Sequence, residues 1–404
     1  MKSSIKTVKQ INIIKKISAI IISFTAAVIL SFQGCENNPN DVGINYIPAT
    51  DTTGVRFLDS ETDSMTITSN NYEYYINTVL ATNLMIGNYQ NYSSKALLKF
   101  YSLPSDYDSA NVISAVLNLR YGDYSFQDKQ GLTDFSVHRV VSNLNYNTIT
   151  YDSVSASDFG IATVGSFSSV VQDSSSINVD LDPAFVKDWF EYAADTTYPV
   201  ENYGMAFLPG LSSTTIKGFF VFNDNVSYVP TVTAIVTKNG VTDTIKLIAS
   251  LGVTLSNAAP IIIPQDRFLL QNGIAYRNIL NFDLSKLPPN VTINNATLQF
   301  TLDNANSYYS ASSNKTVVIG MVTDSVLKKD SIFTNAFLLD TIVYSVSLNS
   351  VFQRWDSGLM PNLGITMKNA SEIQNLNYFA FYSPSYTDPS KRPRLKITYT
   401  LRYQ

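Results

Sequence analysis

The chain contains one sequence pattern twice, and this duplication is what most constrains its fold. Residues 95–119 read KALLKFYSLPSDYDSANVISAVLNL, and residues 277–300 read RNILNFDLSKLPPNVTINNATLQF. In each copy an alternating strand reaches a Leu-Pro turn, a polar loop follows, and a second alternating strand begins. Alternation with a period of two buries one face of a sheet. Proline removes a backbone donor, so it marks the place where each strand stops.

The duplication continues downstream of both copies. The only two tryptophans, Trp189 and Trp355, are each followed by an Asn-x-Gly strand start, at 202–204 and 362–364. An aromatic strand comes next, at 219–222 and 378–382, and each copy ends on a proline-led alternating strand, at 230–236 and 393–399. Four features in the same order, twice, indicate an internal repeat at the scale of a domain, far longer than a solenoid repeat.

Length and composition select two all-β domains. The chain has 404 residues, of which 45% are hydrophobic and 12% aromatic, with 25 Tyr and 22 Phe. Tyr, Phe, Val, Ile and Thr favour pleated surfaces. Short strands joined by turns predict two tandem antiparallel β-sandwich domains of a jelly-roll-like kind, over 54–240 and 241–404. One short helix is expected in each, at 184–192 with Asp182 as cap and Pro183 in first position, and at 349–355.

The first 53 residues read as an export signal followed by a tether. Residues 1–34 begin with five lysines and continue into an apolar run at 17–30 that is too short for a comfortable membrane span. Residues 31–35, Ser-Phe-Gln-Gly-Cys, resemble a bacterial lipobox, in which the cysteine receives palmitate-type acyl chains. Cys35 is the only cysteine, so it forms no intramolecular disulfide. We therefore expect lipidation at Cys35 and a flexible tether over 35–53. The protein is then an outer-membrane lipoprotein of the cell envelope, for which exposure on the cell surface is one option. The alternative is a plain signal peptide with an accidental cysteine.

The charge balance argues against nucleic acid as a partner. Without the five lysines of residues 1–34, 23 basic and 32 acidic residues remain, a net charge of −9. A phosphate backbone is held by clustered Lys and Arg, which such a surface lacks.

The repeated pattern is similar to the DNRLRE-type carbohydrate-binding domain. In that family a strand like residues 96–100 precedes Leu-Pro, and a Trp-bearing turn, an Asn-x-Gly strand and a proline-led final strand follow; residues 136–140 and 392–395 also look like family positions. Residues 35–48 and the strand after them resemble the start of Gram-negative lipoproteins of unknown function. The resemblance implies surface polysaccharide binding or adhesion.

Residues suited to catalysis are few. The chain has one histidine, His138, inside an alternating strand, so it has no multi-histidine metal site, and it has no Gly-x-Ser-x-Gly elbow. We expect no cofactor, no metal and no enzyme activity. Carboxylates are abundant, and a glycoside hydrolase needs only two, so a polysaccharide-cleaving enzyme is one alternative. A purely structural envelope component is the other.

Clustered tyrosines are the candidate ligand-binding residues. Sugars stack their apolar faces on aromatic rings while polar groups bind the hydroxyls, and tyrosine supplies both contacts. Two stretches of the chain carry such clusters, the second of them in an Asn/Ser-rich loop: Tyr72, Tyr74, Tyr75, Tyr89 and Tyr92, then Tyr308 and Tyr309. The competing interpretation is that tyrosine is an ordinary strand residue whose ring half covers the core. We expect a lipid-anchored, non-catalytic protein that binds polysaccharide or mediates adhesion.

Overall fold

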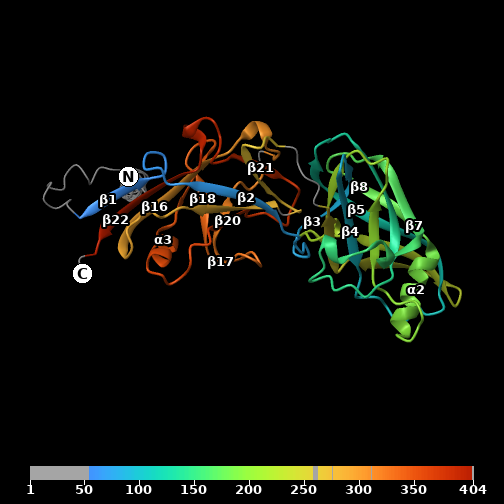
Figure 1. Cartoon of the computed structure of the whole chain (residues 1–404). Coiled ribbons are helices and arrows are strands. Elements are labelled where there is room, and N and C mark those ends of the chain that lie inside the picture. The colour runs from blue at the N-terminus through green and yellow to red at the C-terminus, as the bar shows by residue number, and fades with distance from the viewer. Residues whose placement is uncertain (1–53, 258–262, 275, 311, 403–404) are drawn as a thin grey trace, which may run out of the picture. The chain divides into compact units, whose positions relative to one another are not determined.

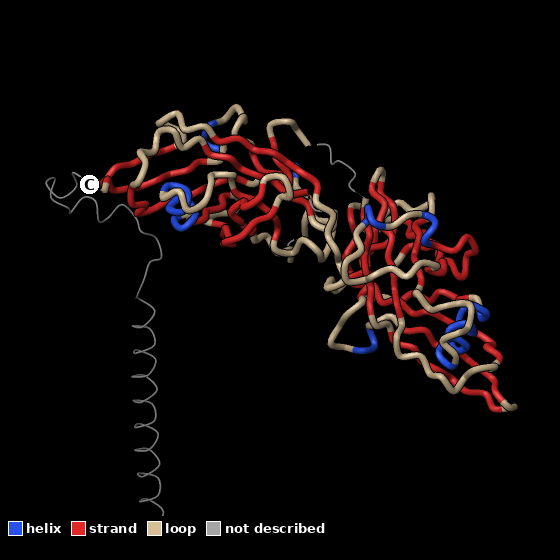
Figure 2. Tube along the Cα trace, turned by 60° about the horizontal axis from the view of Figure 1, so that its bottom comes forward, coloured by secondary structure: helices blue, strands red, loops and turns tan. Residues whose placement is uncertain are grey.

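The computed structural model describes residues 54–257, 263–274, 276–310 and 312–402. The all-β class is confirmed: over these residues the chain forms two eleven-stranded sheets and two short α-helices (Figures 1 and 2). No helix among the described residues has the length and hydrophobicity needed to cross a membrane. The predicted signal 1–34, the lipidation site Cys35 and the tether 35–53 lie outside the described residues.

The first sheet closes on itself. Eight antiparallel strands form a hydrogen-bonded ring, completed by pairing of the first with the last: β10 (Ile216–Phe220), β3 (Asn83–Tyr89), β4 (Tyr92–Lys99), β9 (Met205–Pro209), β6 (Leu132–Val140), β7 (Phe159–Val170), β8 (Ser176–Leu181) and β5 (Asn111–Phe126). Three more strands extend it: β11 (Thr231–Lys238) on β5, β12 (Val241–Ile248) on β11, and β13 (Leu251–Ser256) on β4. Closure satisfies the backbone groups that open strand edges would expose.

The second sheet curls but stays open, because in the described part of the chain the strands at its two edges are not hydrogen-bonded to each other. Its order is β1 (Val55–Asp59), β22 (Arg394–Leu401), β16 (Val291–Thr301), β19 (Val343–Ser347), β18 (Lys329–Leu338), β17 (Val317–Asp324), β20 (Ile365–Asn369), β15 (Tyr276–Phe282), β14 (Arg267–Gln271) and β21 (Tyr378–Tyr382), with β2 (Ile67–Glu73) on β15. A sandwich was expected to consist of two separate facing sheets, whereas each half builds one continuous sheet. Arg394, the first residue of β22, binds both carboxylate oxygens of Asp59, the last residue of β1, at 2.6–3.0 Å.

Strands cross between the two predicted domains. β13 lies after the predicted boundary at 240/241, yet it pairs with β4 from Leu251↔Lys99 to Ser256↔Ser94. Conversely, β2 lies within 54–240 but pairs with β15 of the second sheet. The first sheet therefore takes its strands from residues 83–256, and the second takes two from the start of the chain.

Each sheet encloses its own hydrophobic core, with a tryptophan in each. The inward residues of β4, Ala96 and Leu98, and the following Phe100 are buried in the first core, and Leu280 and Phe282 of β15 are buried in the second. Helix α2 (Pro183–Ala194) buries Trp189, and helix α3 (Asn349–Asp356) buries Trp355. The predicted helix cap is confirmed, because the Asp182 carboxylate accepts the Ala184 N–H at 2.9 Å.

The Asn-x-Gly segments adopt the same structure in both halves. The side-chain amide of Asn202 donates to the carbonyl of Phe100 at 2.9 Å, and that of Asn362 donates to the carbonyl of Phe282 at 2.8 Å. In both halves the asparagine oxygen also accepts the N–H of the glycine two residues later. The sequence repeat is therefore a repeat of local geometry.

Candidate functional site

One buried hydrophobic cluster contains residues of both halves of the chain, and the candidate site lies beside it. Met85, Phe126 and Ile216 of the first half lie together with Leu269 and Leu376 of the second half in one buried cluster. Ile216 and Phe126 lie opposite each other on β10 and β5, on the face that points away from the first core. Residues from Arg56 onward form one compact unit, consistent with this shared cluster.

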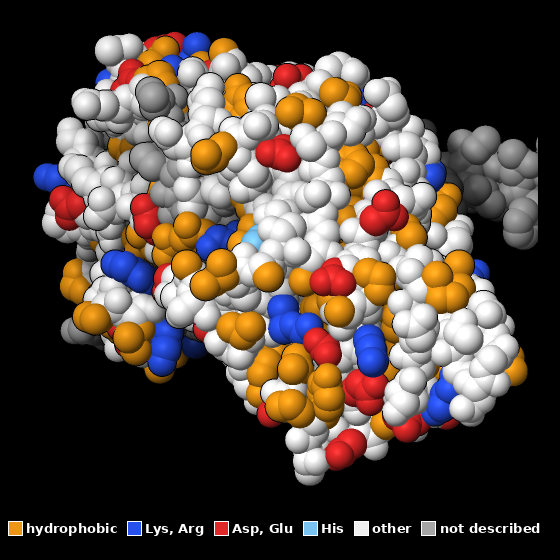
Figure 3. Space-filling model, turned by 90° about the vertical axis from the view of Figure 1, so that its right-hand side faces the viewer, with side chains coloured by type: hydrophobic (Ala, Val, Ile, Leu, Met, Phe, Trp, Pro, Cys, Tyr) orange, Lys and Arg blue, Asp and Glu red, His pale blue; other side chains and the backbone are white. Residues whose placement is uncertain are grey.

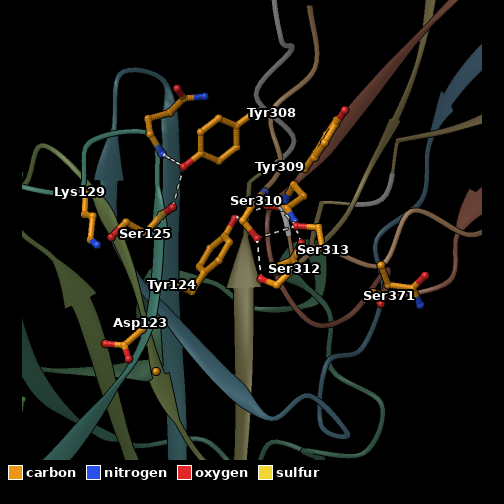
Figure 4. A pocket seen from close by; sticks show the side chains of 15 residues that line it. Asp123, Tyr124, Ser125, Lys129, Tyr308, Tyr309, Ser310, Ser312, Ser313 and Ser371 are labelled. Carbon is orange, nitrogen blue, oxygen red and sulfur yellow. Dashed lines mark hydrogen bonds between the residues drawn. The ribbon is translucent and has the colours of Figure 1, made fainter. Parts of the chain in front are cut away.

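Tyr308 ties the edge of this cluster to strand β5. Its hydroxyl accepts the N–H of Gln127 at 2.8 Å and donates to the carbonyl of Ser125 at 2.7 Å (Figure 4). The ring meets Phe126 edge-on at 5.3 Å between centroids and stacks on Tyr378 at 5.9 Å. Both polar capacities of the hydroxyl are used, so only the ring remains to meet a ligand.

A pocket of about 580 Å³ opens beside Tyr308, and it is the candidate functional site (Figure 4). Its wall combines the end of β5 and the loop after it with two loops of the second half. Most of the lining side chains carry a hydroxyl or an amide: Tyr124, Ser125, Gln127, Tyr308, Tyr309, Ser310, Ser312, Ser313, Asn314, Ser371, Asn375 and Asn377.

Hydrogen bonds between the lining residues hold these groups in place. The Tyr124 hydroxyl accepts the Leu376 N–H at 3.0 Å and donates to the Asn377 side-chain oxygen at 3.2 Å. The Asn377 amide donates to Ser313 Oγ at 2.9 Å. Burial raises the pKa of Tyr124 well above its usual value, so the phenol stays neutral and keeps its proton for donation. The wall is therefore preorganised by contacts between the two halves.

Charge is confined to one side of the pocket, where Asp123 and Lys129 already have partners outside it. Lys129 binds Asp173 at 2.5 Å, and both side chains are largely exposed. Asp123 accepts the N–H of Ser174 at 2.6 Å and its hydroxyl at 3.1 Å. The other lining side chains are uncharged, so the pocket offers mainly neutral hydrogen-bonding groups.

Two of the seven predicted tyrosines line this pocket, Tyr308 and Tyr309. Tyr309 stacks on Phe379 at 5.2 Å, and its hydroxyl donates to Asn304 at 2.6 Å. Tyr89 and Tyr92 belong instead to the hydrophobic cluster between the halves, where Tyr92 is 8% exposed and burial raises its pKa. Tyr89, Tyr92 and Tyr308 all contact Phe126, at 5.9, 5.2 and 5.3 Å between centroids, but of these three only Tyr308 lines the pocket.

The remaining three tyrosines lie at other places. Tyr74 covers the guanidinium of Arg277, 4.0 Å from the ring, and Arg277 binds Glu372 through two hydrogen bonds of 2.7 Å. Tyr72 on β2 faces the same arginine, and burial raises its pKa. Tyr75 stacks on Tyr151 of the first half, 5.8 Å between centroids. These rings do not form one platform with Tyr308 and Tyr309.

The single histidine is held by sheet contacts. His138 places one ring nitrogen 2.8 Å from Ser136 Oγ and the other 2.8 Å from the Gly160 carbonyl. Figure 3 shows this residue (pale blue) on a face of the first half where hydrophobic, acidic and basic side chains are interspersed. Among the described residues no group of three His, Cys, Asp or Glu side chains is placed to hold a metal ion.

Comparison of the chain with known protein families, with curated proteins and with solved structures finds no match in any of the three. The resemblance to DNRLRE-type domains therefore stays a prediction.

Most of the pocket wall carries no signal in the amino-acid sequence. The serines at 310–313 were noticed only as the surroundings of Tyr308, and Asn375 and Asn377 carried no signal of their own. These segments lie more than 60 residues apart, so their meeting depends on the antiparallel bridge between Tyr308 and Tyr378. A run of Ser and Asn beside adjacent tyrosines is the one local pattern that pointed to the place.

Proposed function

We propose that this protein is a non-catalytic, lipid-anchored saccharide-binding protein of the cell envelope, built from two jelly-roll-like modules, and that the pocket beside Tyr308 and Tyr309 holds a neutral sugar. The observation that supports this is the lining: three tyrosine rings and a wall of serine hydroxyls and asparagine amides, with only two charged residues, Asp123 and Lys129, on one side. Sugars need this combination of an apolar ring contact with several neutral donors and acceptors.

Cleavage of a glycosidic bond has weaker support at this place. Hydrolysis requires two carboxyl groups flanking the bond, about 5–10 Å apart. Asp123 is the single acidic residue in the lining, and its oxygens already accept two hydrogen bonds from Ser174. Binding without catalysis is therefore the function we favour.

A glycan-array screen of the full-length protein, followed by calorimetry with the best neutral oligosaccharide, tests the proposal. The variant Ser312→Trp fills the pocket from an exposed position on its wall, and it should abolish binding while leaving the fold intact. The matched control is Ser325→Trp, at an exposed serine outside the pocket, which should bind like the unmodified protein. Unchanged affinity in folded Ser312→Trp, or no bound glycan at all, would contradict the proposal.

A further inference from the structure

A second hollow lies on the first half, outside the pocket described above. It measures about 310 Å³ and is lined by Lys99 at the end of β4, by Tyr101, by Tyr192 and Thr196 at the end of α2, and by Asn202. These residues come from three segments of the chain. The hydrogen bond from the Asn202 side-chain amide to the Phe100 carbonyl joins two of them.

Lys99 is the only charged residue of that lining. Its ammonium lies over three tyrosine rings, 5.2 Å from Tyr101, 5.7 Å from Tyr146 and 5.9 Å from Tyr203. Among the described residues no carboxylate lies within 4.0 Å of it, and no hydrogen-bond acceptor is within reach. Aromatic faces attract a cation but leave its N–H donors unused, so this ammonium retains its capacity to bind an anion.

Tyr101 supplies the second half of a recognition site. Its side chain is 58% exposed, although the strand before it is buried, so a large aromatic surface meets solvent beside the lysine. The backbone of Tyr101 is fixed by a hydrogen bond of 3.0 Å from its N–H to Ser250 Oγ. Tyrosine has few rotatable side-chain bonds, so its ring loses little conformational entropy when a sugar stacks on it.

We propose that this hollow binds an acidic sugar unit, with the sugar ring on Tyr101 and its carboxylate on Lys99. The site is separate from the pocket at Tyr308, and its ligand class differs, because Lys99 has no salt bridge among the described residues, whereas Lys129 in that pocket pairs with Asp173. Thr196, which is exposed, adds a hydroxyl for the sugar.

Glu201 is the acidic residue that opposes such a ligand. It acts on Lys99 through space: burial lowers the pKa of the lysine, and the charge of Glu201 partly counters that effect. The same carboxylate would repel an incoming anion. Its removal should therefore strengthen binding, which gives the proposal a test in the direction of gain.

The experiment is calorimetry of the full-length protein with oligogalacturonate, and with neutral oligogalactan of equal length as the comparison. We expect binding of the acidic oligomer alone. Affinity should fall about tenfold or more in Lys99→Gln, since a charge-assisted hydrogen bond contributes at least that much. It should also fall in Tyr101→Ala, which removes the ring on which the sugar stacks. It should rise in Glu201→Gln. Circular dichroism confirms that each variant is folded.

Two controls separate this site from the rest of the molecule. Lys95→Gln removes a lysine four residues earlier on the same strand that also lies over aromatic rings, 5.1 Å from Tyr151, but that does not line this hollow. Ser312→Trp blocks the pocket at Tyr308. Both should bind oligogalacturonate normally. Equal binding of the neutral oligomer, loss of binding in Ser312→Trp, or no effect of Lys99→Gln would overturn the proposal.

Discussion

Trp189 packs against Phe100 with 5.2 Å between ring centroids, and the same relationship joins Trp355 to Phe282 at 6.2 Å. In each case a short helix places its tryptophan on the last aromatic residue of the strand that opens the repeat. The chain's two tryptophans are thus equivalent residues of two cores. Their positions in the sequence predicted this equivalence.

Truncation of either tryptophan should lower stability strongly. Trp189 is fully buried and Trp355 is 7% exposed, and replacing a buried tryptophan by alanine costs about 3–5 kcal/mol. Urea denaturation of Trp189→Ala and Trp355→Ala measures the loss. The control is Leu211→Ala, whose side chain is fully exposed and whose removal should change the free energy of unfolding by less than about 0.5 kcal/mol. If both tryptophan variants unfold at the same urea concentration as the unmodified protein, the two tryptophans are not buried as described.

The glycines of the two Asn-x-Gly segments should tolerate no side chain. Gly204 and Gly364 have φ of 105° and 88°, and a Cβ on either would lie 2.5 Å from a backbone oxygen, of Leu98 and Leu280 respectively. Gly240→Ala is the matched control, because φ there is 77° but nothing lies within 4 Å. The control should lose about 1–2 kcal/mol from the backbone conformation alone. Gly204→Ala and Gly364→Ala should lose about 1–3 kcal/mol more, through the clash. Equal losses in all three variants by thermal melting would contradict this.

Division of the chain at 240/241 should give two poorly folded fragments. Fragment 54–240 lacks β13, the partner of β4, and carries β2 without its partner β15. Fragment 76–257 contains every strand of the first sheet and should melt cooperatively. A cooperative transition in 54–240 that matches that of 76–257 would show that β13 is dispensable.

Asp303 should make stability depend on acid. Burial by itself raises its pKa, but hydrogen bonds from Arg267, at 2.7 Å, and Asn306, at 2.8 Å, outweigh burial and leave the pKa below 3.8. A carboxyl with a lowered folded-state pKa adds stability above its unfolded pKa and loses it as pH falls through the folded one. At pH 7, Asp303→Asn should cost about 1–3 kcal/mol, because it removes the buried one of the two carboxylates that pair with Arg267 and leaves only the more exposed Asp266, at 2.9 Å.

The deficit of Asp303→Asn should shrink below about pH 4, where the unmodified protein loses the same interaction. Urea titrations at pH 7 and pH 3 measure it, with the exposed Asp224→Asn as control. A deficit that stays constant between the two pH values would mean that the carboxylate charge is not what stabilises the site.

The anchor is tested by Cys35→Ser. If Cys35 carries acyl chains, the variant should move from the membrane fraction to the soluble fraction, because a thiol is required for acylation. The unmodified protein should stay with membranes after a high-salt wash. A variant that still sediments with the envelope and resists salt would remove the lipoprotein assignment.

The sequence predicted what depends on local pattern. Alternation around Leu98 and Leu280 predicted buried strand faces, and Asp182 with Pro183 predicted the start of α2. The pairing of β10 with β5 and of β2 with β15 joins segments about 90 and 200 residues apart, and no local residue pattern specifies such partners. For the same reason Tyr92 reads like Tyr308 in the sequence. Only the sheet order shows that Tyr92 is buried between the halves and that Tyr308 borders a pocket.

The Asp59–Arg394 contact acquires a mechanical meaning if the chain is held at Cys35. Because β1 pairs with β22, tension from the N-terminus would enter the second sheet, although most of the first sheet comes earlier in the sequence. Asp59 at the end of β1 and Arg394 at the start of β22 form a bidentate ion pair that would resist separation of the two strands. Tension between the anchor and a bound ligand would then reach the second sheet through this ion pair.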